Sequence, residues 1–222
     1  AVTAATGAVA SFPLPQAGSA PRSIVAGPDG ALWFTEFAGN RIGRITTTGT
    51  ITEYTLAAGS APDTITNGPD GALWFTMRTG NAIGPITTQG AVSSYPLPST
   101  GAGPQGITQG SDGNLWFTSG GLSYYGNPRI GRITTAGVVT TFSHPDLAGP
   151  DGITATPGGM WFTDSSGSYS GAIGHIAIDG VIQLDGPGTS NPGAITKGSD
   201  ESVRFANSGF QEEIASGVGR ID

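Results

Sequence analysis

The sequence contains no cysteine and only one lysine, and these absences exclude several classes of protein. Without cysteine there are no disulfides, thiol nucleophiles or thiolate metal ligands. Lys197 is the only lysine, and the formal net charge is −7 at pH 7. Binding to nucleic acid or to an anionic membrane needs a basic surface, which this composition does not supply. We therefore expect no nucleic acid and no membrane surface among the partners.

Long apolar runs and helical periodicity are also missing. No stretch of about 18 apolar residues is present, so we expect no membrane insertion. Charged residues make up only 11% of the chain, whereas disordered chains are usually highly charged. The 38 glycines and 16 prolines therefore belong to the turns of a folded protein. The length of 222 residues suits one well-buried domain spanning residues 1–222.

The remaining composition bears on the compartment and on solubility. The chain is rich in threonine, serine, glycine and alanine, and its first residue is Ala1 and not methionine. These features favour an exported bacterial protein, secreted or on the cell surface, with a cytoplasmic location as the alternative. The acidic balance favours solubility, and we expect a monomer.

A Leu-Trp-Phe-Thr motif recurs along the chain and defines five repeats. Its central position is occupied by Trp33, Trp74, Trp116, Trp161 and, in a diverged fifth copy, Arg204. These positions lie 41, 42, 45 and 43 residues apart. Such a period suits four short strands, which is the unit of a propeller blade. The sequence therefore predicts an all-β fold, a five-bladed β-propeller of four-stranded antiparallel blades.

Each repeat shows the same order of local patterns. A Pro-x-x-Ile segment, as at residues 21–24, is interpreted as the innermost strand, and a Gly-Pro-Asp-Gly turn follows at residues 27–30. The Leu-Trp-Phe-Thr strand comes next, followed by an Ile-Gly-Arg-Ile strand at residues 42–45. An outer strand near residues 50–54 alternates apolar and polar residues, which is typical of a half-exposed edge. We assign the aspartates of the turns to turn chemistry alone.

The two ends of the chain predict how the propeller closes. The fifth repeat stops after its third strand at Ile221, and residues 8–12 match the outer strand that it lacks. We expect this N-terminal strand to complete the C-terminal blade, which removes an open sheet edge. The expected blades are residues 21–61, 62–103, 104–149, 150–191, and 192–222 together with 6–20.

The repeat resembles that of a known family. Residues 27–36 read Gly-Pro-Asp-Gly-Ala-Leu-Trp-Phe-Thr-Glu, and residues 40–45 read Asn-Arg-Ile-Gly-Arg-Ile. This combination resembles the repeat of the virginiamycin B lyase (streptogramin lyase) family, over essentially the whole chain. The resemblance implies a propeller, usually of seven blades. It also implies a C–O lyase that opens the ester-linked ring of streptogramin B antibiotics by elimination, with Mg²⁺.

The resemblance further implies two catalytic positions in a blade. One is a histidine after the proline of the inner strand, and the other is a glutamate that ends the Trp-Phe-Thr strand. Both lie at the same end of adjacent strands, so a base and a carboxylate would meet at the mouth of the central channel. In this chain the two positions hold Arg22 with Glu36, Asp63 with Met77, Gln105 with Ser119, Asp151 with Asp164, and Gly193 with Asn207.

No blade has histidine at the first position. The two histidines lie elsewhere: His144 is in a connection between blades, and His175 takes the arginine position of a third strand. His175 is better explained as a sheet residue than as a base. The missing base favours a binding or scaffold propeller over an inherited lyase.

Charged residues at the channel mouth are the candidates for a site. Arg22 and Glu36 would bind a charged ligand, or would neutralise one another as a cross-strand ion pair. Asp151 and Asp164, with Asp63, would hold Mg²⁺ or Ca²⁺ through carboxylate oxygens. They would alternatively serve as an acid–base pair, if one carboxylate raises the pKa of the other. The plainer explanation is that these aspartates are solvated or cap a turn.

Aromatic residues extend the candidate site. Tyr124, Tyr125 and Tyr169 lie in the longest connections between second and third strands, on the same face as the aspartates. Exposed aromatic side chains on loops of a rigid scaffold are common binding devices. The alternative is that each tyrosine packs on its own loop.

We therefore expect a binding or scaffold propeller with its ligand site at the top face of the channel. The expected ligand-binding residues are Arg22, Glu36, Asp63, Gln105, Tyr124, Tyr125 and Tyr169, and the partner is a small molecule, a glycan or a protein. The alternative is a metal-assisted lyase or hydrolase acting on a cyclic ester or lactone such as a streptogramin. Its catalytic candidates are Glu36, Asp151 and Asp164, and its cofactor would be Mg²⁺ or Ca²⁺. A purely structural or engineered repeat module is a third interpretation.

Overall fold

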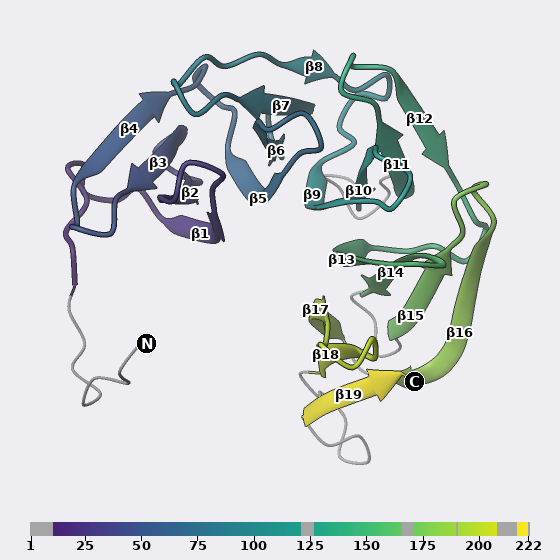
Figure 1. Ribbon diagram of the computed structural model, residues 1–222. Helices are drawn as coiled ribbons and strands as arrows, with labels where there is room; N and C mark the ends of the chain where they lie inside the picture. Colours follow the sequence, from purple (N-terminus) through teal and green to yellow (C-terminus); the bar gives the residue numbers. More distant parts are fainter. Residues whose placement is uncertain (1–10, 121–126, 166–170, 190, 208–216, 222) are drawn as a thin grey trace.

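The protein folds into five antiparallel sheets that stand side by side in an arc, with their first strands on the inside (Figure 1). The computed structural model describes residues 11–120, 127–165, 171–189, 191–207 and 217–221. These residues contain strands and turns but no helix, and hence no helix able to cross a membrane. The expected all-β class and antiparallel four-stranded blades are confirmed.

The strands follow chain order from the inside of each blade to its outer edge. Blade 1 contains β1 (Pro21–Ala26), β2 (Leu32–Glu36), β3 (Arg41–Ile45) and β4 (Ile51–Thr55). Blade 2 contains β5 (Pro62–Asn67), β6 (Leu73–Met77), β7 (Ala82–Ile86) and β8 (Tyr95–Pro96). Blade 3 contains β9 (Pro104–Gln109), β10 (Leu115–Ser119), β11 (Arg129–Ile133) and β12 (Val139–Phe142). Blade 4 contains β13 (Pro150–Thr156), β14 (Gly159–Asp164), β15 (Gly171–Ile176) and β16 (Ile182–Thr189), and blade 5 contains β17 (Pro192–Lys197), β18 (Val203–Asn207) and β19 (Gly217–Ile221).

The aspartate of each inner turn fixes both the turn and the neighbouring tryptophan. Asp29 Oδ1 accepts hydrogen bonds from the Ala31 backbone N–H (3.3 Å) and from the Trp33 Nε1–H (3.0 Å). Gly30 has a φ of 77°, which glycine adopts without strain. Equivalent bonds from the indole reach Asp70 and Asp112. These aspartates serve the turn, as the sequence predicts.

The fifth blade keeps this bond but replaces the tryptophan. The Arg204 guanidinium pairs with Asp200, with an Nη2–Oδ2 distance of 2.8 Å. The side of blade 5 that would face a following blade therefore presents a charged pair where the first three blades present a buried indole.

Tryptophan packing joins each blade to the next. Trp33 is fully buried and lies in one cluster with Ile65, Leu73 and Phe75 of blade 2. The pattern repeats with Trp74 against blade 3 and with Trp116 against blade 4. We call the tryptophan side of a blade its forward face, and the Leu-Phe side its rear face. Burial of large aromatic and aliphatic side chains between these faces is the main source of stability of such a fold.

Blade 1 has no described blade behind it. Figure 1 shows blades 1 and 5 on opposite sides of an opening in the arc. Accordingly, Ile24 on the rear face of blade 1 is 61% exposed, whereas the equivalent Ile65 of blade 2 is 4% exposed. The outer edge of β19 has no partner strand within the described part of the chain. Because residues 1–10 lie outside that part, closure of the ring by residues 8–12 stays a prediction.

Candidate functional site

Buried threonine hydroxyls set the positions of the residues at the channel mouth. The Thr35 Oγ1 accepts a hydrogen bond from the Ser23 N–H (3.1 Å) and donates one to the Asp63 carbonyl of the next blade (2.7 Å). The same donation recurs from Thr76 to the Gln105 carbonyl and from Thr118 to the Asp151 carbonyl. The threonine that ends each of the first three motifs thus fixes the inner strand of the following blade.

Asp63 lies between two arginines at this mouth. Its Oδ1 is 3.0 Å from Arg22 Nη1, and its Oδ2 is 3.6 Å from Arg78 Nη1. The Arg22 guanidinium also stacks over the Phe37 ring, with its central carbon 3.4 Å from the ring centroid. Arg22 therefore pairs across the blade boundary with Asp63, and the cross-strand pair with Glu36 that the sequence suggested is not formed.

Asp151 is the carboxylate that this network leaves without a direct partner among the described residues. Burial raises the pKa of Asp151, and the negative charge of Asp63 raises it further, whereas Arg78 and Arg22 act in the opposite direction. A carboxyl group with a raised pKa takes up protons more readily than an ordinary aspartate, which suits a general base or a hydrogen-bonding group. Asp151 thus combines a raised pKa with a carboxyl that no described residue engages directly.

Gln105 stands on the inner strand between Asp63 and Asp151. A Cβ at Gly120 would lie 2.9 Å from the Gln105 Nε2, so the glycine makes room for the amide. The amide offers both a donor and an acceptor to a ligand. Three of the predicted ligand-binding residues, Arg22, Asp63 and Gln105, therefore occupy equivalent positions on consecutive inner strands.

Asp164 has a structural role that the sequence did not specify. Its two carboxylate oxygens accept hydrogen bonds from the backbone N–H groups of Ala148 and Gly149. Burial raises the pKa of Asp164, and these two backbone bonds lower it in part. The carboxylate caps the connection that leads from blade 3 into blade 4. Both of its oxygens are therefore already engaged by backbone N–H groups.

Glu36 is enclosed and does not open onto the mouth. It is fully buried, and neither carboxylate oxygen has a hydrogen-bond partner within the described part of the chain. Burial raises its pKa, Glu53 adds to this effect, and Ser19 and Arg41 oppose it. Arg41 pairs with Glu53 at 3.6 Å. Contact between Glu36 and a ligand would require the surrounding structure to move.

Replacing Glu36 by methionine is expected to stabilise the protein by about 1–2 kcal/mol at pH 7. Met77 holds the same position in blade 2 and packs in the core there, whereas Glu36 buries two unpaired oxygens. Because the pKa of Glu36 is raised in the folded state, its contribution to stability is fully present below the ordinary glutamate pKa and is lost as the pH rises. The gain should therefore be larger at pH 7 than at pH 4, as measured by urea unfolding. Glu201→Met, at an exposed residue, is the control with little expected change.

The described residues do not provide the expected Mg²⁺ or Ca²⁺ site. Among them, no three histidine or acidic side chains lie close enough to hold a metal ion together. Of the predicted ligands, Asp63 is engaged by two arginines and Asp164 by two backbone N–H groups, which leaves Asp151. A hard cation needs about six oxygen ligands. The acidic side chains of the described residues therefore do not fit a Mg²⁺ or Ca²⁺ ion.

The remaining predicted residues lie away from this network or outside the described part. Tyr124, Tyr125 and Tyr169 lie outside the described residues. The His144 Nδ1 accepts a hydrogen bond from the Asp146 N–H (3.3 Å), and the His175 ring lies 4.9 Å from the Trp161 ring on the third strand of blade 4. Neither histidine occupies an inner-strand position. Arg78 was missed by the sequence argument, although its place directly after β6 could have suggested it.

The geometry of the blades agrees with comparisons to known proteins. A sequence model of the virginiamycin B lyase family matches residues 2–209. The chain belongs to this family. The resemblance predicted from the repeat is thereby confirmed.

Individual members show the extent of the likeness. The virginiamycin B lyase of Nocardia farcinica is 31% identical over 177 residues, covering 79% of this chain and 58% of that protein. A streptogramin B lyase structure is 42% identical, with a TM-score of 0.82 over 94% of this chain and 67% of that one. A catalytically inactive histidine-to-alanine variant of the Staphylococcus aureus lyase, solved with quinupristin, is also 42% identical, with a TM-score of 0.80 over 93% and 67% of the two chains. The chain thus spans just over half of the Nocardia protein and two thirds of the solved lyases.

Proposed function

We propose that this member of the virginiamycin B lyase family binds a small polar molecule at the channel mouth, through Arg22, Asp63, Gln105 and Asp151. The observation that carries the proposal is Asp151, a carboxyl on an inner strand with a raised pKa and no direct partner among the residues that the structure describes. Asp151 is half-buried at the mouth, so its carboxyl can still accept hydrogen bonds from a ligand that lies beside the charged network. The inner-strand positions hold no histidine, which supports binding without the family's elimination chemistry.

The charges at the mouth define the chemistry of the ligand. Asp63 and Asp151 together balance the charges of Arg22 and Arg78, so the mouth offers little net charge. Gln105 and Asp151 remain to accept or donate hydrogen bonds. A neutral molecule with several amide groups, such as a cyclic depsipeptide, matches this arrangement better than a strongly charged ligand. We propose that the protein binds such a ligand as an exported monomer.

The test is calorimetric titration with quinupristin. The wild-type chain is expected to bind it, and Asp151→Asn is expected to weaken binding about tenfold or more through loss of a half-buried carboxyl that hydrogen-bonds the ligand. Asp146→Asn, at a side chain that is 81% exposed, is the matched control and should bind like the wild type. Equal affinity of wild type and Asp151→Asn would contradict binding of the ligand at the channel mouth.

A second function is favoured by the raised pKa of Asp151 together with family membership. As a base, Asp151 would take the proton next to the ester-bearing carbon of a cyclic depsipeptide. The C–H electrons would form a carbon–carbon double bond, and the ester C–O bond would break with the carboxylate as leaving group. Mass spectrometry separates the outcomes, because elimination leaves the mass unchanged and opens the ring, whereas hydrolysis adds one water. Turnover with or without Mg²⁺ that is lost in Asp151→Asn would favour this function over binding alone.

We also propose that residues 8–12 complete blade 5. Phe12 supports this, since it packs against Gly49 as Tyr54 packs against Gly90 of the next blade. Phe12 is thus placed where the outer strand of a preceding blade would end. A cysteine pair introduced at residues 10 and 220, which oppose one another in the register of the equivalent strands of blade 1, is expected to crosslink within one chain; crosslinking only between chains would contradict ring closure.

A further inference from the structure

The inner strands of blades 3 and 4 approach each other closely at the channel mouth. A Cβ at Gly106 of β9 would lie 2.5 Å from the Asp151 carbonyl oxygen of β13, so only glycine fits there. The Thr118 hydroxyl bridges the same two strands, because it accepts a hydrogen bond from the Gly106 N–H (2.9 Å) and donates one to the Asp151 carbonyl. Gln105, which precedes Gly106, and Asp151 therefore start from closely spaced backbones.

Gly120 allows the Gln105 amide to reach toward blade 4. A Cβ at Gly120 would lie 2.9 Å from the Gln105 Nε2 and 3.3 Å from the Pro150 carbonyl oxygen. Both atoms thus lie within 3.3 Å of one point, so the amide nitrogen stands beside the residue that precedes Asp151. Blades 1 and 2 carry large side chains at the position of Gly120, namely Phe37 and Arg78. In blade 3 the Gln105 amide takes the place that such a side chain would fill.

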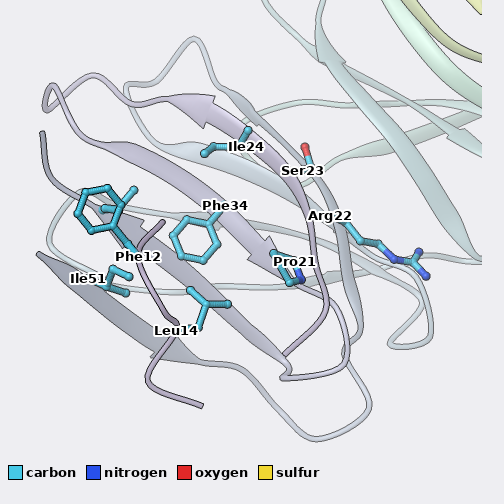
Figure 2. Close-up of a pocket in the computed structure, with 9 residues that line it drawn as sticks. Phe12, Leu14, Pro21, Arg22, Ser23, Ile24, Phe34 and Ile51 are labelled. Carbon is cyan, nitrogen blue, oxygen red and sulfur yellow. The ribbon is translucent and has the colours of Figure 1, made fainter. Parts of the chain in front are cut away.

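The charged side chains of blades 1 and 2 at the mouth are engaged with one another. Figure 2 shows the Arg22 side chain extending away from the apolar side chains of blade 1, and Asp63 lies between Arg22 and Arg78. Within the described part of the chain, the side chains of Gln105 and Asp151 make no hydrogen bond to another residue. The boundary between blades 3 and 4 therefore offers a ligand N–H donors from Gln105 and carboxylate acceptors from Asp151.

We infer that Gln105 and Asp151 together bind one secondary amide of a peptide ligand, with Gly120 as the residue that positions Gln105. The Gln105 Nε2–H donates to the ligand carbonyl, and the Asp151 carboxylate accepts a hydrogen bond from the ligand N–H. Hydrogen bonds to a charged acceptor are stronger than those between neutral groups. An ester has no N–H, so this pair of residues selects amides over esters. The inference rests on the proposed binding at the channel mouth and names the chemical group that is recognised there.

NMR titration of the protein with N-methylbutanamide and with methyl butanoate tests the inference. The two probes differ only in the amide N–H, which the ester replaces by oxygen. The wild type is expected to bind the amide about tenfold more tightly than the ester, with saturable shifts of the Gln105 side-chain amide signals. Asp151→Ala is expected to bind both probes with equal affinity, because it removes the acceptor of the N–H.

Gly120→Ala is expected to give a different result, since its added Cβ displaces the Gln105 amide that binds the carbonyl of both probes. Binding of the amide and of the ester should weaken by a similar factor of about five, so the preference for the amide is retained. Gly158→Ala, at a glycine whose Cβ would meet no atom within 4 Å, is the matched control and should bind like the wild type. Circular dichroism of each variant checks that it is folded.

Equal binding of amide and ester by the wild type, or no saturable shift with either probe, would overturn the inference. An unchanged affinity of Gly120→Ala for both probes would also overturn it. Titration with quinupristin separates this inference from the proposed function. Affinity for quinupristin that falls in Asp151→Asn but not in Gly120→Ala would support the proposed function and contradict the amide pairing. An amide preference in the wild type, together with no binding of quinupristin, would support the pairing and contradict the proposed ligand.

Discussion

Trp116→Ala is expected to lower the free energy of unfolding by about 3–5 kcal/mol. The Trp116 side chain is fully buried, stacks on Phe142 with ring centroids 5.5 Å apart, and packs with Ile153 and Phe162 of blade 4. Its removal leaves a cavity between two blades, and it also removes the indole donor from Asp112. Such a space cannot close without moving a whole blade, so most of the lost contacts stay lost.

Urea unfolding, followed by the fluorescence of the remaining tryptophans, measures the effect of Trp116→Ala. Trp161→Ala is the matched comparison, because Trp161 has the same place in its motif but is only partly buried. A clearly smaller loss is expected there. Similar losses in the two variants would show that packing between blades 3 and 4 contributes no more than packing at the end of the arc.

Asp164→Ala is expected to cost about 2–4 kcal/mol, since it leaves the backbone N–H groups of Ala148 and Gly149 without an acceptor. Asp164→Asn keeps one acceptor oxygen and should lose less. Because burial raises the pKa of Asp164, the folded protein holds the proton more tightly than the unfolded chain. The contribution of Asp164 is therefore fully present below the ordinary aspartate pKa and declines as the pH rises through the raised value.

Thermal unfolding at pH 4 and pH 7 checks both statements for Asp164. Asp146→Ala, an exposed carboxylate in the same connection, should change stability by no more than about 0.5 kcal/mol. A cost for Asp164→Ala that matches this control would mean that the connection holds its shape without the cap.

The repeat made most of the fold predictable from sequence. Tryptophan spacing fixes the number of blades, and the Gly-Pro-Asp-Gly turn with its alternating strands fixes their order and direction. These signals are local, because each rests on residues close together in the chain. Closure differs, since it depends on contacts between the two ends, and there the sequence offers a matching strand but no measure of the distance between blades 1 and 5.

The channel mouth was predictable in position but less so in pairing. Counting from the prolines identifies Arg22, Asp63, Gln105 and Asp151 as equivalent residues. The interaction partners at the mouth come from other blades or from connections. Asp63 forms ion pairs with Arg22 and Arg78, and Asp164 accepts hydrogen bonds from the backbone N–H groups of residues 148 and 149. Side-chain reach across a blade boundary is not encoded in the repeat pattern. For the same reason, Glu36 looked accessible in sequence, although the fold encloses it.

The hydroxyl groups of Thr35, Thr76 and Thr118 have a consequence for ligand selection. Each ties the inner strand of its own blade to the inner strand of the next, so neighbouring strands cannot shift separately. The distances between the side chains that face a ligand are then determined by the spacing of the blades. For the ligand proposed at the channel mouth, these bonds predict selection by width, because the inner strands cannot move apart or together to fit a molecule of another size.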